Sequence, residues 1–306
     1  MLITNTPYFW KKKFHLFTLV LLPFSLIYFF LIKLNKIKFF FQPKIKIKTI
    51  CVGNINIGGT GKTPLVKKIY DELKINQKCC ILKKFRCNQI DEIKLLNAGK
   101  DLFTPKRRID GLREAELQSY NSVIIDDGMQ DYSFKKDISI LCIKSRAAFG
   151  NQFILPAGPL REPLAEIKQY NIAVINGDKN KNLENILKRN NQNIKIFYSN
   201  YVIKNIGTLK SKKFLAFSGI ADNQSFFIAL KENDVEVLST KEFSDHHKFT
   251  EQEISKLINE AKIKNIELIT TDKNYNNIPE KFKDKIYHTI LDVKINNKTE
   301  FLNEIN

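Results

Sequence analysis

The residues best suited to chemistry form a glycine-rich stretch at 53–63, which reads GNINIGGTGKT. An apolar run precedes this stretch and a run with the apolar spacing of a helix follows it, so it connects a strand to a helix. Glycines let the backbone turn until its N–H groups point at phosphate oxygens, and the start of the helix adds partial positive charge. We therefore predict a loop that binds the phosphates of a nucleoside triphosphate.

The predicted nucleotide contacts come from the second half of this loop: Gly58, Gly59, Thr60, Gly61, Lys62 and Thr63. Lys62 is long enough to reach the β- and γ-phosphates, so we also assign it a catalytic role, and the Thr63 hydroxyl is suited to Mg²⁺. The strict pattern G-x-x-x-x-G-K-[ST] requires glycine at position 56, where this chain has Asn56. A literal motif search therefore fails, and the assignment rests on the strand–turn–helix context.

Two adjacent aspartates, Asp126 and Asp127, follow the apolar run Val123–Ile125. A phosphate-binding α/β fold places the carboxylate that orders Mg²⁺ at the end of such a strand. Considered alone, an aspartate pair in this position is more often a helix cap or a turn. Together with the loop at 53–63, it indicates a metal-binding role for Asp126.

The elements that must position these residues are short apolar runs separated by helical patterns. Runs typical of strands lie at 49–52, 79–82, 123–125, 138–143 and 172–175, and a helical pattern lies at 64–73. This alternation favours a P-loop NTPase-like parallel α/β sheet with helices on both faces. Residues 179–200 are rich in Asn and Lys and show weak periodicity, and a second series of elements begins near 214. We expect an N-terminal membrane-associated helix at 1–42, a nucleotide-binding kinase domain at 43–200 and a smaller α/β domain at 201–306.

The N-terminal run from Phe14 to Ile32 contains no acidic or basic group apart from His15, and lysines flank it on both sides. As a helix it would be roughly 28 Å long, about the thickness of the hydrocarbon core of a bilayer. No small-x-small cleavage site follows, which disfavours a signal peptide, and Pro23 is compatible with a kinked or interfacial helix. Lysines on both flanks favour a helix in the cytoplasmic leaflet over a true span. A buried core helix is the alternative, and we expect membrane attachment.

Composition narrows the classes of function. The chain has 306 residues, of which 43% are hydrophobic and 27% charged, as expected of a globular protein. Its formal charge of +18 fits an anionic membrane, a polyanionic substrate, nucleic acid, or residue usage without functional meaning. The basic residues are spread along the chain, so we expect no nucleic-acid partner, and we predict no protein partner. The five cysteines lack C-x-x-C spacing and are expected to be reduced.

Five blocks of the sequence, in order, resemble the tetraacyldisaccharide 4'-kinases of lipid A biosynthesis. They are GNINIGGTGKTP at 53–64, DDGMQ at 126–130, FGN with LPAGPLREP at 149–163, FSGIA with FF at 217–227, and FSDHHKF at 243–249. The resemblance covers the whole chain. It implies a P-loop domain plus a smaller α/β domain, with ATP and Mg²⁺ as cofactors. The implied reaction is transfer of the γ-phosphate to the 4'-hydroxyl of a lipid disaccharide 1-phosphate, at the cytoplasmic face of the inner membrane.

The resemblance also implies roles that the spacing alone does not identify. Asp91 occupies the place of a G-D-E-P-like motif, so it inherits the role of catalytic proton acceptor for the sugar hydroxyl. His246 is implied as its orienting catalytic partner. The alternatives are a solvated carboxylate at a helix start and a structural histidine. The residues assigned to the substrate are Arg161, Glu162 and Asp127, and arginine suits bidentate binding of phosphate.

The chain departs from the family at several positions. Family members usually carry S-R-G-Y-G after the second strand, whereas this chain has KKFRC at 83–87 and almost no spacer before Asp91. The block at 126–130 usually continues with His, and here Asp131 follows. The main alternative function is a membrane-tethered P-loop ATPase or GTPase switch, which would hydrolyse its nucleotide without any sugar lipid.

Overall fold

The computed structural model describes residues 7–97, 101–146, 148–220, 222–245 and 247–306, without the side chains of Asn88 and Asp91. Contacts divide these residues into two compact units. The larger unit contains the described residues of 6–85, 99–200 and 293–306, and the smaller unit contains those of 86–98 and 201–292. This division differs from the ranges expected from the sequence, because 86–98 packs with the smaller unit and 293–306 returns to the larger one. The N-terminal helix also belongs to the larger unit.

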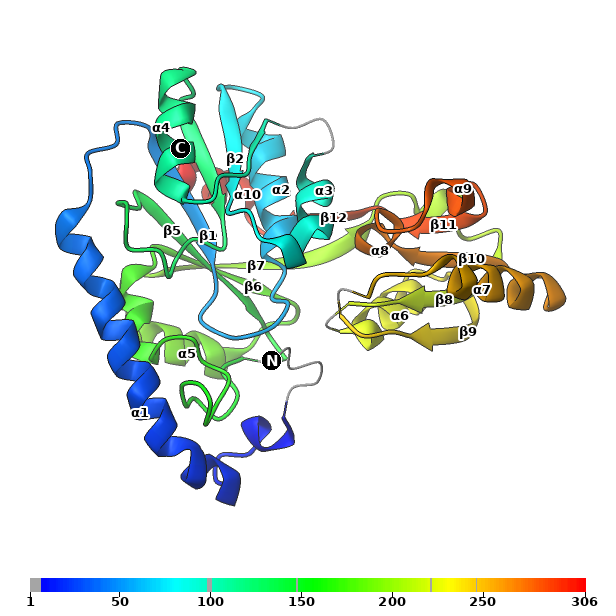
Figure 1. Cartoon of the computed structure of the whole chain (residues 1–306), viewed down its shortest axis with the longest axis horizontal. Helices are drawn as coiled ribbons and strands as arrows, with labels where there is room; N and C mark the ends of the chain where they lie inside the picture. The colour runs from blue at the N-terminus through cyan, green and yellow to red at the C-terminus, as the bar shows by residue number, and fades with distance from the viewer. Residues whose placement is uncertain (1–6, 98–100, 147, 221, 246) are drawn as a thin grey trace. The chain divides into compact units, whose positions relative to one another are not determined.

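The larger unit is built on an eight-stranded sheet with the order β12-β7-β6-β5-β1-β4-β2-β3 in the described part of the chain (Figure 1). The strands are β1 (Lys48–Gly53), β2 (Cys79–Lys83), β3 (Leu102–Phe103), β4 (Ser122–Asp126), β5 (Ile138–Lys144), β6 (Ile172–Asn176), β7 (Lys195–Ile203) and β12 (Leu291–Ile295). All neighbours from β3 to β7 pair in parallel. The central strands are almost entirely buried. The parallel α/β sheet predicted from the apolar runs is therefore confirmed.

Helices pack against this sheet. They are α2 (Lys62–Leu73), α4 (Arg108–Leu117), α5 (Lys181–Asn190) and α10 (Lys298–Ile305). The larger unit also contains the 3₁₀ helices η1 (Tyr8–Lys11), η2 (Ile37–Phe41) and η4 (Leu164–Gln169). The Asn- and Lys-rich region, whose periodicity is weak, forms α5 and part of β7. Asn180 caps α5 by accepting a hydrogen bond from the Leu183 backbone N–H, and Leu183 and Leu187 are buried. One cap and one narrow apolar stripe are enough for a short helix that packs on a sheet.

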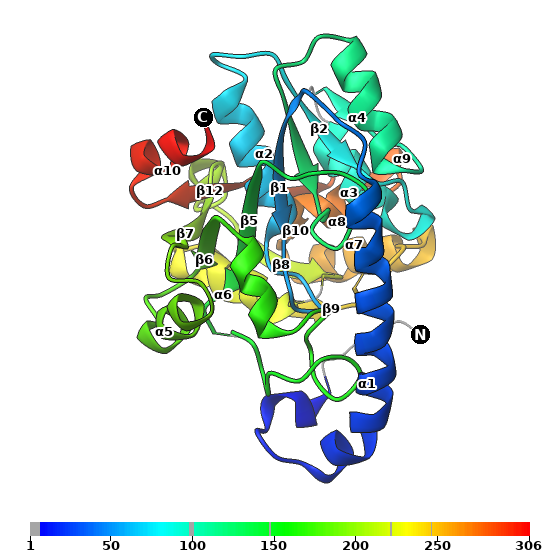
Figure 2. The ribbon, with the colours of Figure 1, turned by 90° about the vertical axis from the view of Figure 1, so that its left-hand side faces the viewer.

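The N-terminal apolar run forms α1 (Leu16–Lys36), which continues into η2. His15 caps α1 by accepting a hydrogen bond from the Phe17 backbone N–H, and Lys33 and Lys36 lie in the last turn, where positive charge is favourable. The helical segment Leu16–Phe41 is long and apolar enough to cross a membrane, and only 11% of its most apolar 18 residues are buried in the protein. Figure 2 shows α1 along one flank of the larger unit, with α10 on the opposite flank. The buried core helix is thus the weaker interpretation.

The smaller unit has a parallel sheet with the order β11-β10-β8-β9. Its strands are β8 (Lys213–Ser218), β9 (Glu236–Glu242), β10 (Glu267–Thr271) and β11 (Ile286–Thr289). Its helices are α3 (Ile90–Asn97), α6 (Asn223–Glu232), α7 (Glu251–Ile263), α8 (Asp272–Tyr275) and α9 (Glu280–Lys283), with η3 (Cys87–Gln89) and η5 (Ile206–Thr208). A capping box between Thr250 and Glu253 begins α7. The second α/β domain predicted from the sequence is therefore present as a separate sheet.

Candidate active site

The glycine-rich loop runs from the end of β1 to the start of α2, as the sequence predicts. Gly61 precedes α2 with a φ of 89°, and Gly58 has a φ of 108°, a conformation that side chains with a Cβ rarely adopt. Lys62 and Thr63 are the first two residues of α2, so the free N–H groups of the helix start and both side chains lie at the loop. This is the strand–turn–helix arrangement that binds phosphate.

Asn56, which replaces the glycine of the strict motif, has a structural role in the loop. Its side-chain amide donates a hydrogen bond to the backbone oxygen of Ala148, and its backbone forms a bridge with Leu160. The Arg161 backbone N–H donates to the oxygen of Ile55 at 2.7 Å. The phosphate loop is therefore held against the LPAGPLREP segment, and Asn56 provides an anchor that a glycine would lack.

Asp126 ends β4 beside Thr63. The Thr63 hydroxyl donates a hydrogen bond to Oδ2 of Asp126 at 3.1 Å. Asp126 is 1% exposed, and its Oδ1 has no hydrogen-bond partner among the described residues. A buried carboxylate oxygen without a partner beside a hydroxyl fits the oxygen-ligand chemistry of Mg²⁺. Thr63 and Asp126, which the sequence assigns to the metal, are thus brought together and suit it.

Asp127 connects the loop lysine to Arg161. One guanidinium nitrogen of Arg161 lies 2.9 and 3.2 Å from the two carboxylate oxygens of Asp127, and Nζ of Lys62 lies 3.6 Å from Oδ1. Burial by itself would raise the pKa of the Asp127 carboxyl, but the surrounding lysines and arginines outweigh it and hold the pKa well below its usual range. Asp127 also has a left-handed backbone with a φ of 54°, a strain that is common at functional sites.

Arg108 and Asp131 extend this network. Arg108 is 5% exposed, donates a 2.6 Å hydrogen bond to the backbone oxygen of Asp127, and forms a 3.2 Å ion pair with Asp131. Burial opposes ionisation of Asp131, yet hydrogen bonds from Ser133 and the charge of Arg108 lower its pKa. Asp131, which stands where the family usually has His, is therefore the partner of a buried arginine.

Glu162 lies inside the protein. It is 3% exposed and accepts hydrogen bonds from the Tyr132 hydroxyl and, at 3.0 Å, from the Gln130 side-chain amide. Arg161, its neighbour, remains partly accessible, with 26% of its side chain exposed. The substrate roles of both residues stay predictions, and the surroundings of Arg161 leave it the better placed of the two.

The predicted proton acceptor and its partner lie outside what the structure describes in full. The backbone of Asp91 lies in α3, but its side chain and the whole of His246 are among the residues that are not described. The described residue next to the latter, His247, has Nε2 3.1 Å from a carboxylate oxygen of Glu253. The pairing of Asp91 with His246 therefore stays a prediction.

Two contacts of the larger unit were not predicted from the sequence. Lys83, at the end of β2, forms a 2.6 Å ion pair with Asp126, and a charge that ends a buried apolar run was the available signal. The LPAGP segment docks the N-terminal helix. The Ser25 hydroxyl donates to the oxygen of Ile154 at 3.0 Å and accepts from the Ala157 N–H at 3.1 Å. A lone serine within an apolar run was the only sign of that contact.

Comparison with known proteins identifies the family of this chain. A family model described as tetraacyldisaccharide-1-P 4'-kinase matches residues 17–82 and 91–306. The chain belongs to this family. A tetraacyldisaccharide 4'-kinase of Pelagibacter ubique is 38% identical over 307 residues, which cover 98% of this chain and 96% of that protein. A tetraacyldisaccharide 4'-kinase of Rickettsia felis is 30% identical over 320 residues, which cover 97% of this chain and 95% of that protein.

A solved structure has the same fold. The crystal structure of the "apo" form of LpxK from Aquifex aeolicus in complex with ATP has a TM-score of 0.71 and 23% identity, and the match covers 95% of this chain and 98% of that one. As a tetraacyldisaccharide 4'-kinase family member, this chain is a kinase that uses ATP with Mg²⁺. The switch alternative is not favoured, and the model leaves unmatched only a short internal stretch at 83–90 and the first 16 residues.

Proposed function

We propose that this kinase transfers the γ-phosphate of ATP to the 4'-hydroxyl of a tetraacyldisaccharide 1-phosphate in lipid A biosynthesis. The observation that carries the proposal is the cluster of Lys62, Thr63, Asp126, Asp127 and Arg161 at the phosphate loop, in a chain that the family model matches along most of its length. Phosphoryl transfer needs mainly positioning and neutralisation of charge, which cations around a phosphate loop provide.

Each residue of the cluster has a part in this proposal. Asp127 keeps Lys62 and Arg161 close together before the nucleotide binds, so little reorganisation is needed when the triphosphate arrives. Lys62 then binds the β- and γ-phosphates. Thr63 and Asp126 would hold Mg²⁺, which neutralises charge on the phosphates when it is bound. Arg161 binds phosphate on the acceptor side, where its accessible guanidinium suits bidentate contacts.

The acceptor hydroxyl needs a base, and we propose Asp91 with His246 as its orienting partner. A sugar hydroxyl is a weak nucleophile, so a carboxylate that accepts its proton assists the transfer. The backbone of Asp91 lies in the first turn of α3, in the smaller unit that also contains the described neighbours of His246. The described residues on both sides of His246 therefore belong to the same compact unit as the backbone of Asp91, although they lie far apart in the sequence, and this supports the pairing.

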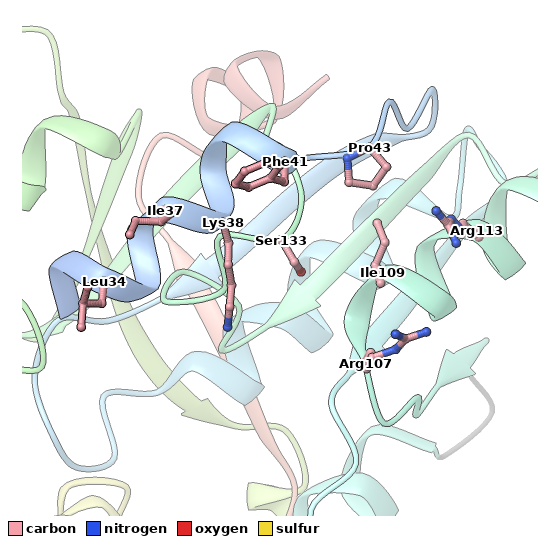
Figure 3. Close-up of a pocket in the computed structure, with 9 residues that line it drawn as sticks. All are labelled: Leu34, Ile37, Lys38, Phe41, Pro43, Arg107, Ile109, Arg113 and Ser133. Atoms are coloured by element: carbon pink, nitrogen blue, oxygen red, sulfur yellow. The ribbon is translucent and has the colours of Figure 1, made fainter. Parts of the chain in front are cut away.

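A groove beside α1 fits the phosphorylated lipid. It has a volume of ≈ 690 Å³ and is lined by Leu34, Ile37, Lys38, Phe41, Pro43, Arg107, Ile109, Arg113 and Ser133. Figure 3 shows apolar side chains from α1 and η2 on one side and the two arginines across from them, with Lys38 pointing into the space between. Cations next to an apolar wall suit a lipid that carries a phosphate. We propose that the groove receives the 1-phosphate end of the acceptor.

Contacts connect this groove to the nucleotide site. The backbone N–H of Ser133 donates to Asp131, Asp131 pairs with Arg108, and Arg108 bonds the backbone of Asp127. All of these residues belong to the larger unit. The exposed apolar face of α1 would bind the protein to the bilayer. We therefore propose the cytoplasmic surface of the inner membrane as its location.

The test is transfer of labelled γ-phosphate from ATP to a tetraacyldisaccharide 1-phosphate. We expect labelled lipid with the wild type, none above background with Lys62→Ala, and a large loss with Asp91→Asn at nearly unchanged ATP affinity. Asp234→Asn, at an exposed ion pair with Lys210 in the smaller unit, is the matched control and should retain activity. ATP hydrolysis without labelled lipid would refute the proposed acceptor and support a switch.

A further inference from the structure

A buried lysine lies against the carboxylate assigned to the metal. Lys83 is the last residue of β2 and is paired in register with Asp126, the last residue of β4. Its Nζ is 2.6 Å from Oδ2 of Asp126, and the two side chains are only 4% and 0% exposed. The adjacent ion pair at the loop is longer and more exposed to solvent. Nζ of Lys62 lies 3.6 Å from Oδ1 of Asp127, and the two side chains are 12% and 15% exposed.

This contact leaves Asp126 with one oxygen for other partners. Oδ2 accepts from both the Lys83 ammonium and the Thr63 hydroxyl, whereas Oδ1 is buried without a hydrogen-bond partner among the described residues. The charge of Asp126 is therefore compensated inside the protein before any metal binds. Residues 83–90 are also the internal stretch that the family model does not match. Lys83 therefore lies just beyond the part of the chain that the family model matches.

A purely structural role would not require the charge. A buried ion pair contributes little net stability compared with a well-packed apolar pair, because both ions lose their hydration. Lys83 instead places a positive charge where the negative charge of the triphosphate will arrive. Mg²⁺ would share the Asp126 carboxylate with the Lys83 ammonium, so the ammonium lowers the affinity of this carboxylate for Mg²⁺.

We propose that Lys83 is a built-in cation of the nucleotide site, which neutralises Asp126 and lets this kinase bind ATP with little dependence on Mg²⁺. The ammonium supplies part of the compensation that a divalent cation would otherwise supply alone. Mg²⁺ remains able to bind through Oδ1 of Asp126 and the Thr63 hydroxyl. The inference rests on the proposed function only for the presence of an ATP site, and its test requires no acceptor lipid.

The test compares ATP affinity in excess Mg²⁺ and in EDTA by isothermal titration calorimetry. For the wild type we expect Mg²⁺ to tighten binding by less than about tenfold, whereas in Lys83→Met the difference should widen by at least about tenfold, within the usual range of coupling between two ligands. The reason is that the charge of Asp126 then faces the triphosphate without compensation in EDTA. Lys84→Met, at the next position in the sequence, is the matched control and should behave like the wild type.

A second readout needs no nucleotide. Mg²⁺ alone should raise the melting temperature of Lys83→Met more than that of the wild type, because it then binds an uncompensated carboxylate in the folded state only. Equal Mg²⁺ effects on both proteins, in affinity and in melting temperature, would show that Lys83 is only structural and would overturn the proposal.

A milder substitution provides the test in case Lys83→Met does not fold. Lys83→Gln keeps a hydrogen-bond donor toward Asp126 without the charge, and we expect the same widened Mg²⁺ dependence. If neither variant folds, the wild type decides, since tightening of ATP binding by Mg²⁺ of more than about tenfold in that protein would refute the proposal. Absence of ATP binding under both conditions would instead refute the proposed kinase site.

Discussion

The nucleotide side and the lipid side of the larger unit are built in opposite ways. At the phosphate loop, charged groups are buried and paired with one another, as in the contacts of Asp126 and Asp127. Along α1, apolar groups are exposed, including Leu16 at 72% and Phe30 at 65%. In the first region the charged groups are paired within the protein, whereas the second leaves apolar surface in water that a bilayer or lipid would cover. The comparison suggests that the ATP site is preorganised and that the acceptor side is completed by the membrane.

The largest effect should come from the preorganised side. Lys62→Ala removes the cation that reaches the β- and γ-phosphates, so we expect kcat to fall by about 10³-fold, as when one preorganised donor is lost from a transition state. Membrane binding should be unchanged, because α1 is untouched. Steady-state kinetics and vesicle sedimentation measure the two quantities. A parallel loss of membrane binding would show that the two regions are not independent.

Removal of apolar surface from α1 should affect only the lipid side. Serine at Phe17, Phe24 and Leu31, which are 60%, 57% and 57% exposed on one face, should weaken binding to anionic vesicles at least about tenfold. The apparent KM for the lipid should rise and that for ATP should not. Leu117→Ser, at an 85% exposed position of α4, is the control. Unchanged vesicle binding in the triple variant would contradict a membrane role for α1.

The cations of the groove should have a smaller effect. Lys38→Ala and Arg113→Ala should each raise the KM for the acceptor about fivefold, from about 1 kcal/mol for each basic residue near anionic lipid. The affinity for ATP should stay constant, as measured by calorimetry. Each effect should shrink at high salt, because exposed charges are screened. An increase in KM that is the same for ATP and lipid would place the groove at the nucleotide side.

The smallest effect concerns alkaline pH and the buried core behind the phosphate loop. Burial raises the pKa of Cys51 and Cys79 to about 11 and that of Cys142 to about 12. These folded-state values lie above those of the unfolded chain, so their contribution is complete below about pH 8.5 and is lost as pH rises toward 12. We expect the melting temperature to fall between pH 9 and 11 by a few degrees.

Alkylation of the cysteines tests the burial of the same core. Cys87 is exposed, whereas the other four cysteines are buried. Iodoacetamide at about pH 8 should modify Cys87 in the folded protein, and the others only after unfolding, because the reactive thiolate is scarce and shielded there. Mass spectrometry of the modified protein measures this. Rapid modification of Cys142 in the folded state would show that the core behind the loop opens.

Local sequence was enough to predict the phosphate loop and five strands of the larger sheet, namely β1, β2, β4, β5 and β6. Glycines, Lys62 and Thr63 lie within a few residues of one another, and fully apolar strands follow from short-range patterns. The boundaries of the units were not predictable in this way. The segment at 86–98 packs with the smaller unit, and the C-terminal strand β12 joins the sheet of the larger unit. Each therefore packs with residues that are distant in the sequence, and such contacts leave no local pattern.

The sequence by itself determined that this chain has a P-loop α/β fold, an apolar N-terminal helix and the motifs of a lipid kinase. Only the tertiary structure decided which charges meet at the site. Lys83 and Asp126 are brought together by the parallel register of β2 and β4, and Ser25 meets the LPAGP loop across more than a hundred residues. Charge is visible in a sequence, but its partner depends on the alignment of strands and on the packing of helices. The alignment of strands and the packing of helices are determined by hydrophobic burial, which involves the whole molecule and no single segment.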